Sequence, residues 1–331
     1  MRYTRTLIGI ALAVNLLAGK KKNPDDMTQT LELPRDPPSV AVGDARRLVF
    51  SVSPLSGKGL LTQQTREALK TILKENGGVP VIHIRAFVAG SGDVRRVPQI
   101  VSEVFTEKKL PLPSVSVIRA GGLPVENAQV VLEAVSLAKR EVNAGGLRFV
   151  AGEESVGNDA AAPVRPLLMK ALDALASKAA GASPLEVTCF VSELSDAGAL
   201  NSAIAGRFPG AAIDLVQTQR LPWQAFAECE AIARGASGGP ARLAFTGTRV
   251  AFGAEEKDGA LAFQRLDKDL AEAGAGPSDI VLTNVYPLSA TVAKLARKLR
   301  PASAERDGVL FEGLASMDAG FAVDAVAVVS R

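Results

Sequence analysis

The feature that most constrains the fold of this 331-residue chain is a hairpin-like segment that occurs three times. Each copy has a leucine in a turn between two strand-like runs, and these residues, Leu123, Leu221 and Leu314, lie 98 and 93 residues apart. That period is longer than the roughly 20–50 residues of a solenoid repeat, so each copy should have a small core of its own. With 47% hydrophobic residues, the chain can supply three such cores.

The order of the other predicted elements repeats with the hairpin. Each copy begins with a strand and continues with an amphipathic helix, whose apolar residues recur at spacings of three and four. Each helix then runs into a glycine that can take the left-handed conformation at a helix end: Gly77, Gly181 and Gly274. A further strand, a second amphipathic helix and the hairpin complete each copy. The sequence therefore predicts an α+β unit with helices on one face of a sheet.

Two glycine-containing connectors, EVNAGG and GASGGP, separate the copies. The predicted domains are residues 41–140, 147–234 and 241–331. The uncovered sheet faces of three such units can pack together in a ring, an arrangement that ordinarily takes three identical chains. We therefore predict a single-chain pseudo-trimer that is a monomer in solution.

The N-terminal residues 1–19 look like a signal peptide, because the basic segment MRYTRT precedes the apolar run LIGIALAVNLLAG. Export to the periplasm is favoured, and a cytoplasmic location is the alternative if this segment is not a functional signal. The apolar run is too short to span a bilayer comfortably, so no integral membrane domain is predicted. LLAG resembles the start of a lipoprotein processing site, but Lys20 stands where lipidation needs a cysteine. Residues 20–40 combine charge with four prolines and are predicted to be a disordered tether.

The chain has two cysteines and one histidine, and all three lie in strand-like runs. For Cys189 and Cys229, two buried thiols are the favoured interpretation, and a disulfide stays open if the chain is exported. His83, in VPVIHIRAFV, is expected at a buried strand position. A single histidine excludes a histidine-rich zinc site elsewhere in the chain.

The charge pattern gives no sign of a nucleic-acid partner. The formal net charge is +3, and the Lys and Arg residues are scattered rather than clustered with aromatic residues. The segment LSGKGL contains Gly-Lys but lacks the upstream glycine and the following Ser or Thr of a phosphate-binding loop. The sequence therefore predicts neither nucleic-acid nor nucleotide binding.

The element order and two segments resemble the Rid or YjgF family, also labelled endoribonuclease L-PSP. The segments are QRLPWQAFAECEAIA in the second copy and FEGLASMDAGFAVDAVAV in the third. The resemblance implies three tandem, degenerate chorismate-mutase-like domains. It also implies a hydrolase similar to 2-iminobutanoate/2-iminopropanoate deaminases, which converts reactive enamines and imines of amino acids to 2-keto acids without a metal or organic cofactor.

The same resemblance implies a cleft between domains, where an arginine holds the substrate carboxylate and a glutamate activates water. Arg306 matches the arginine in the third copy, and Glu228 matches the glutamate in the second. Asn201 matches a polar pocket residue of the second helix. Gly152 and Gly247 match glycines that let the backbone approach the ligand.

No single copy has the whole pattern. The third has Ala322 at the glutamate position, the second has Ile213 near the arginine position, and the first has Leu112 and Val131 at the two positions. Glu228 can therefore be a catalytic base or a residue on an exposed sheet face. The alternative to one composite active site is a non-catalytic scaffold that binds a small carboxylate or a partner protein.

Overall fold

The computed structural model describes residues 33–90, 93–235, 241–300 and 309–329. All of them except Leu33 belong to one unit, Pro34–Arg331. The predicted signal-like segment and the predicted tether as far as residue 32 lie outside the described residues. Within the described ranges, no helix is both long and apolar enough to cross a membrane.

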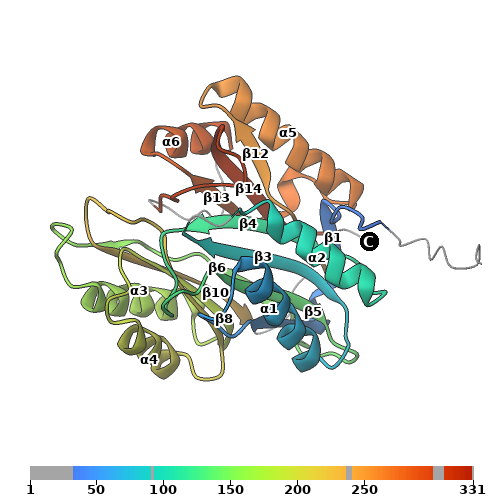
Figure 1. Cartoon of the computed structure of the whole chain (residues 1–331), viewed down its shortest axis with the longest axis horizontal. Coiled ribbons are helices and arrows are strands. Elements are labelled where there is room, and N and C mark those ends of the chain that lie inside the picture. Colours follow the sequence, from blue (N-terminus) through green and yellow to red (C-terminus); the bar gives the residue numbers. More distant parts are fainter. Residues whose placement is uncertain (1–32, 91–92, 236–240, 301–308, 330–331) are drawn as a thin grey trace, which may run out of the picture. The chain divides into compact units, whose positions relative to one another are not determined.

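The fold is α+β, as the repeat predicts, and its strands form three sheets (Figure 1). In the first sheet the strand order is β2, β5, β3, β4, and helices α1 and α2 pack on it. β3 and β4 are parallel, whereas the other neighbours are antiparallel. The elements are β2 (Leu48–Val52), α1 (Leu61–Glu75), β3 (Val81–Ala89), α2 (Arg96–Glu107), β4 (Ser114–Ala120) and β5 (Val130–Leu137).

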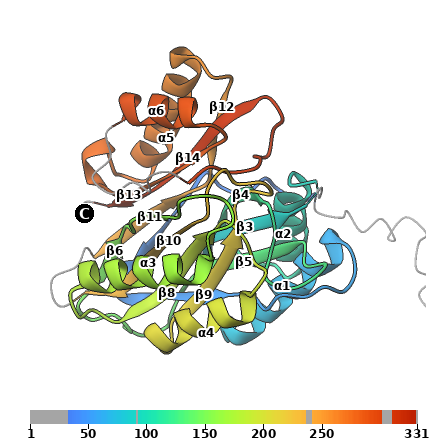
Figure 2. The same cartoon turned by 90° about the vertical axis from the view of Figure 1, so that its left-hand side faces the viewer.

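The second sheet repeats this arrangement, with the order β6, β10, β8, β9. β8 and β9 are parallel, and the short strand β7 also pairs with β10. Helices α3 and α4 pack on this sheet (Figure 2). The elements are β6 (Leu147–Val150), β7 (Ser155–Val156), α3 (Val164–Ala179), β8 (Pro184–Val191), α4 (Ala197–Arg207), β9 (Ala212–Gln217) and β10 (Phe226–Arg234).

The third sheet is centred on β14, which pairs with β11, β12 and β13. Helices α5 and α6 pack on it. Its elements after the second connector are β11 (Arg242–Thr246), β12 (Arg249–Phe252), α5 (Glu256–Glu272), β13 (Ile280–Pro287), α6 (Ala290–Leu299) and β14 (Ala319–Val328). Two 3₁₀ turns, Ala45–Arg47 and Pro277–Asp279, complete the described elements.

The strand β1 (Val40–Asp44) directly precedes the first sheet in the sequence but belongs to the third sheet. It pairs antiparallel with β11, from Val40 opposite Thr246 to Asp44 opposite Arg242. The backbone N–H of Gly247 also donates a 2.7 Å hydrogen bond to the carbonyl of Ser39. Pairing therefore connects the start of the described chain to the sheet that contains its end.

The glycines that follow the first helix of each copy have the predicted left-handed backbone. Their φ angles are 60° at Gly77, 78° at Gly181 and 82° at Gly274. No atoms lie within 4 Å of a Cβ built at Gly77 or Gly181, so backbone conformation rather than crowding favours glycine there.

The three sheets share one strand register. A phenylalanine of the first strand lies opposite an apolar residue of the last strand in each sheet: Phe50 opposite Val135, Phe149 opposite Ile232, and Phe245 opposite Val326. The same last-strand residues lie opposite His83, Glu186 and Leu282 of the third strands. A side chain at a given position in one sheet therefore has a counterpart at the equivalent position in each of the other two sheets.

Apolar side chains from all three sheets meet in two clusters. One contains Phe87, Phe190 and Tyr286, and in it Phe190 and Tyr286 both make edge contacts with Phe311. The other contains Phe50 and Phe245. Because these clusters combine residues of separate sheets, the sheets pack together through the faces that their helices leave uncovered.

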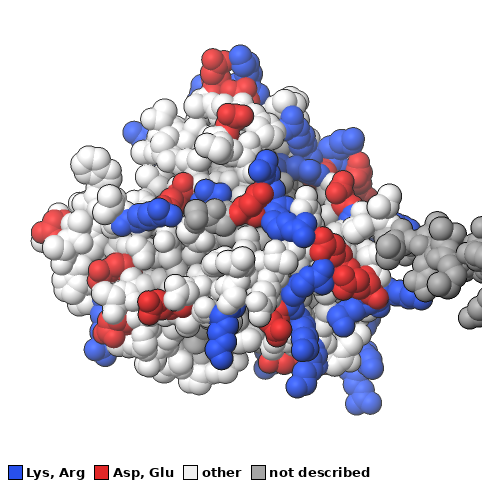
Figure 3. All heavy atoms as spheres, in the orientation of Figure 1, with Lys and Arg blue, Asp and Glu red and all other residues white. Residues whose placement is uncertain are grey.

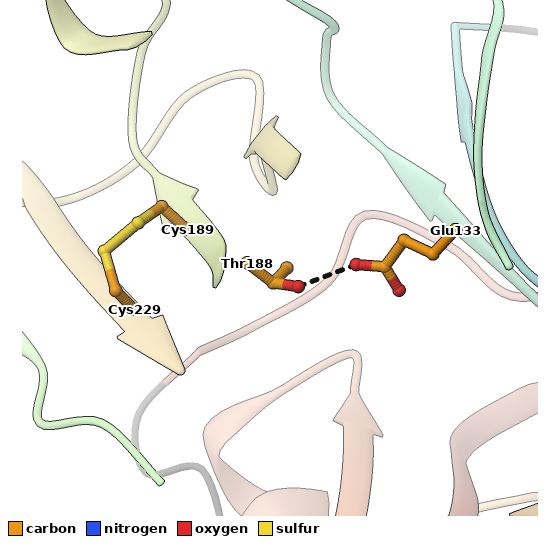
Figure 4. Close-up of a disulfide and its surroundings, with 4 residues drawn as sticks. All are labelled: Glu133, Thr188, Cys189 and Cys229. Atoms are coloured by element: carbon orange, nitrogen blue, oxygen red, sulfur yellow. Dashed lines mark hydrogen bonds between the residues drawn. A yellow bond between two sulfur atoms is a disulfide. The ribbon is translucent and has the colours of Figure 1, made fainter. Parts of the chain in front are cut away.

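Cys189 and Cys229 form a disulfide, so the interpretation as two buried thiols is wrong (Figure 4). Their burial is as predicted, since both are fully inaccessible to solvent. They lie directly opposite each other on the antiparallel strands β8 and β10, with Cα atoms 4.1 Å apart. That opposition brings the two sulfurs together, and it depends on strand register. Disulfides are typical of proteins in oxidising compartments.

We expect the disulfide to stabilise the fold substantially, because it closes a loop with a sequence separation of 40 residues. Chain-entropy arguments give about 4 kcal/mol for a loop of this length. Denaturant unfolding with and without a reductant measures the difference. The double variant Cys189→Ala/Cys229→Ala should be less stable than the oxidised wild type and should not respond to the reductant. Equal stability of the wild type with and without reductant would contradict the prediction.

Candidate functional site

A polar layer lies at the level of Arg85, between the two apolar clusters. Strand alternation produces it: Ile84, Ala86 and Val88 of β3 join the core under α1 and α2, whereas Arg85 and Phe87 face the other sheets. At the corresponding level, the sheets pair Arg85 with Glu133, Thr188 with Glu230, and Asn284 with Asp324. Each last strand therefore contributes one carboxylate to this layer.

Arg85 links the first two sheets. Its Nε donates a hydrogen bond to Glu133, and its second guanidinium nitrogen donates to Thr188 Oγ1 at 3.2 Å. The remaining nitrogen lies 3.5 Å from Glu230 Oε1. Thr188 in turn donates to Glu133 Oε1 at 2.6 Å, the contact drawn in Figure 4. One guanidinium therefore holds groups from β5, β8 and β10.

Asp324 links the third sheet to the first. Ser116 of β4 donates to its Oδ2 at 2.9 Å. Within the third sheet, Asn284 donates to Oδ1 at 2.7 Å and Tyr286 donates to Oδ2 at 3.0 Å. Three donors satisfy this buried carboxylate, so its position in the layer is fixed from several directions.

The buried carboxyl groups of the layer do not share one charge state. Burial alone would raise the pKa of Glu133, but the charge and hydrogen bond of Arg85 hold it below its usual value. For Asp214 and Glu186, burial raises the pKa well above the usual value, and the negative charge of Glu133 adds to this shift. Burial also raises the pKa of Asp324. The layer thus favours the ionised form of Glu133 and disfavours the ionised forms of Asp214, Glu186 and Asp324.

His83 is a buried strand residue, as the sequence predicts. Its ring stacks on Phe245, and its Nδ1 lies 2.9 Å from Ser114 Oγ. The Ser114 hydroxyl also lies 3.2 and 3.3 Å from two carbonyl oxygens, so it has three possible acceptors, one of which is Nδ1. Burial, with a smaller contribution from the charge of Arg85, lowers the pKa of His83 to about 3. The neutral ring then has one N–H donor and one acceptor nitrogen.

A cavity opens within this layer, which we call the Arg85 cavity. Its acidic lining residues are Glu133, Glu186, Glu230 and Asp324, and its lining includes Arg85 and His83. It leaves about 40 Å³ for the centres of water-sized spheres. One water needs roughly 10–15 Å³ on this measure, so about three water-sized groups fit. On the face drawn in Figure 3, by contrast, Lys and Arg are interspersed with Asp and Glu at the surface.

Glu228 lies two residues before Glu230 on β10, so its side chain is on the same inter-sheet face as the polar layer. It is fully buried, so the interpretation as a residue on an exposed sheet face is wrong. It lies opposite Phe190, and its neighbours Ala227 and Cys229 face the core under α3 and α4. The corresponding residues of the other sheets are Val131 and Ala322, both in the apolar cluster.

Of the other predicted site residues that the structure describes, Gly152 packs against the backbone of Cys229, next to Glu228, whereas Gly247 packs against Val115. Asn201 is half-buried on α4, whose Leu200 packs in the core on the opposite sheet face. A Cβ at Gly152 would lie 1.9 Å from the carbonyl oxygen of Cys229. A Cβ at Gly247 would lie 2.9 Å from that of Val115. Both glycines are therefore explained by close approach of neighbouring backbone.

Arg306 lies outside the described residues. The described chain resumes at Val309, which belongs to the same apolar cluster as Phe190. Phe311 contacts the Phe190 ring with centroids 5.9 Å apart. The described residues nearest to Arg306 in the sequence thus pack beside the strand partner of Glu228.

The Arg85 layer is not among the features predicted from the sequence, although a pattern in the sequence points to it. Charged residues interrupt otherwise apolar strand runs at Arg85 in VIHIRAFVA, at Glu133 in VVLEAVSL and at Asp324 in AVDAVAV. Charged residues are rarely buried unless they are paired, so such interruptions in a strand point to a buried network. The pairing of these residues across sheets is not readable from the sequence.

No protein-family model and no curated protein matches the chain. Similar solved structures include a YjgF-family member from Mycobacterium tuberculosis, 19% identical, covering 26% of this chain and 79% of its own, at TM-score 0.24. A conserved Rid-family protein of unknown function from Yersinia pestis is 16% identical, covers 28% of this chain and 78% of its own, and has TM-score 0.24. A cyanuric acid hydrolase from A. caulinodans is 12% identical, covers 86% of this chain and 100% of its own, and has TM-score 0.23. At these scores none of the likenesses carries an argument about function.

We expect the single histidine not to titrate in the folded protein near neutral pH. Because its pKa falls from 6.5 to about 3 on folding, the unfolded chain binds a proton that the folded chain does not. The His83 contribution to the free energy of unfolding is therefore present above pH 6.5 and is lost as the pH falls toward 3. Imidazole proton shifts by NMR should stay constant from about pH 8 to 5. The stability difference between wild type and His83→Gln should change below pH 6.5, and an NMR midpoint near 6.5 would contradict the assignment.

We expect Arg85→Met to destabilise the protein by roughly 3–5 kcal/mol, because it leaves Glu133 buried without its cation. The double variant Arg85→Met/Glu133→Gln should recover part of that loss, since it removes both charges. Denaturant unfolding measures both effects. Arg66→Met is the matched control, because Arg66 pairs with Glu103 at the surface, where the expected cost is about 0–1 kcal/mol. Equal costs for the two single variants would refute a special role for Arg85.

Proposed function

We propose that the chain is a single-chain pseudo-trimer of three tandem, degenerate chorismate-mutase-like domains of the Rid type. The shared strand register of the three sheets supports this, since Phe50, Phe149 and Phe245 occupy one level of their sheets. The mixed apolar clusters support it as well, because they bury the faces that a single domain would expose.

We infer that its activity is the hydrolytic deamination of reactive imines and enamines that carry a carboxylate. The observation that carries this proposal is the position of Glu228, which is buried on the inter-sheet face beside Phe190. Phe311, close in sequence to Arg306, contacts the same ring. Three residues span at most about 11 Å, so covalent geometry limits how far Arg306 can be from Val309.

The proposed reaction needs one group that binds the substrate and another that accepts and donates a proton. In the proposal, the Arg306 guanidinium binds the carboxylate through two parallel hydrogen bonds. Glu228 takes a proton from water as the water oxygen bonds to the imine carbon and the C=N electrons move to nitrogen. Glu228 returns this proton to the nitrogen, which gives an amino alcohol. It then takes the proton of the hydroxyl group as the C=O bond forms, and the leaving nitrogen receives that proton as the C–N bond breaks, so the products are a 2-keto acid and ammonia. An enamine first takes a proton at carbon to become the imine.

A second candidate is the non-catalytic scaffold, which would bind a small carboxylate or a partner protein. Full burial of Glu228 favours it, because a water-activating carboxylate has to meet water and substrate. Gly152 and Gly247 also favour it, since the close approach of neighbouring backbone accounts for both glycines without a ligand. The two functions differ in a measurable way, because only the first consumes an imine.

We expect Glu228→Gln to slow 2-aminoacrylate or imine hydrolysis about 10²- to 10⁴-fold while sparing carboxylate binding. Arg306→Lys should weaken binding of a 2-keto acid roughly ten- to a hundredfold, because lysine keeps the charge but loses the planar fork. Steady-state kinetics and calorimetry measure the two effects.

Glu193→Gln, at an exposed position after β8, is the matched control for the glutamate variant. Wild-type protein that binds a 2-keto acid without hydrolysing any imine would overturn the enzymatic proposal and favour the binding scaffold. Protein that does neither would leave a scaffold for a protein partner as the surviving function.

A further inference from the structure

The Arg85 cavity is separate from the site proposed for hydrolysis, because Glu228 is not among its lining residues. Its lining comes from all three sheets: Arg85 from the first, Glu186 from the second and Asp324 from the third. It therefore exists only when the three sheets are packed together, and its chemistry can be considered independently of imine hydrolysis.

One lining carboxyl group has an unsatisfied oxygen. Glu186 is only 4% exposed, and its Oε2 has no hydrogen-bond partner among the described residues. Strand alternation turns Glu186 to the same side as Thr188, toward Arg85 and Glu133. A buried polar atom without a partner costs roughly 1–3 kcal/mol, so a donor in the cavity would relieve a real penalty.

The cavity is rich in acceptors. Four carboxyl groups line it, and the neutral ring of His83 lies beside them. The one lining cation, Arg85, already donates to Glu133 and Thr188 and lies close to Glu230. An anion would meet the carboxyl oxygens without a donor to bind it, whereas a cation with several N–H donors matches these acceptors and can take the place of a proton on Glu186.

The size of the cavity and the arrangement of its side chains further limit which cation it can bind. The cavity has room for about three water-sized groups, so a small cation fits it. Within the described ranges, no group of three or more His, Cys, Asp or Glu side chains is arranged to hold a metal ion. The aromatic rings of Phe149 and Phe245 line one side and could contact a methyl group.

We propose that the Arg85 cavity binds a small primary ammonium ion, either ammonium itself or methylammonium, with Glu186 as its main acceptor. The bound cation donates to Glu186 Oε2, and its positive charge favours the ionised form of that carboxyl group. This inference does not rest on the proposed hydrolysis, and a protein without any deaminase activity can still bind the ion.

The test is thermal unfolding of the full chain in ammonium chloride or methylammonium chloride, against sodium chloride at equal ionic strength. The melting temperature should rise with the concentration of either ammonium salt, because the ion binds the folded state alone. Tetramethylammonium, which has the charge but no N–H donor and is larger, should have no more effect than sodium. In Glu186→Gln the apparent affinity should fall at least about tenfold, since a charge-assisted hydrogen bond is lost. Glu193→Gln is the matched control and should respond as the wild type does.

A second measurement uses wild-type protein, so it does not depend on the folding of the variant. With nitrogen-15-labelled ammonium, NMR should show contacts between the bound ammonium protons and the aromatic ring protons of Phe149 and Phe245, which line the cavity. An equal thermal response in wild type and Glu186→Gln, equal stabilisation by tetramethylammonium, or no contact to the aromatic rings would each overturn the proposal.

Discussion

The buried ion pair between Arg85 and Glu133 is the interaction on which the packing of the three sheets depends. Removing two charges from water costs several kcal/mol for each ion, and a close pair compensates for this only when further hydrogen bonds satisfy the remaining groups. Here Thr188 of the second sheet supplies one of those bonds to each partner. The pair is therefore satisfied only while the first two sheets are in contact, and Asp324 extends the same dependence to the third.

The two apolar clusters and the polar layer between them have different effects on the structure. Apolar contact provides most of the driving force but is not directional, so by itself it would tolerate small shifts of one sheet against another. Hydrogen bonds at 2.6–3.2 Å tolerate much less. We infer that the layer fixes how the sheets are aligned. A single chain can also place one arginine opposite three carboxylates, whereas three identical chains would place an arginine in every sheet.

The region around Glu228 and the Arg85 cavity also differ because the three sheets contribute different side chains to each of them. At the level of Glu228 the corresponding positions are Val131 and Ala322, so one carboxylate lies among apolar and aromatic side chains. At the level of Arg85 several carboxyl groups lie close together, and burial with mutual repulsion raises the pKa values of Glu186 and Asp214. The first environment suits a single proton-accepting group beside an organic substrate. The second suits a cation that relieves repulsion among acids.

The sequence by itself determined the α+β class, the threefold recurrence of elements, the helix ends at Gly77, Gly181 and Gly274, and the burial of His83 and both cysteines. These features follow from local periodicity and backbone preference, which a single chain segment contains. Only the tertiary structure decided that Cys189 and Cys229 are bonded, that Gly152 and Gly247 accommodate neighbouring backbone, and that Glu228 is buried. The Arg85 layer likewise depends on the tertiary structure, because residues that hydrogen-bond within it are separated by up to 208 residues in the sequence. Strand register and sheet packing bring such residues together, and neither is encoded in any one segment.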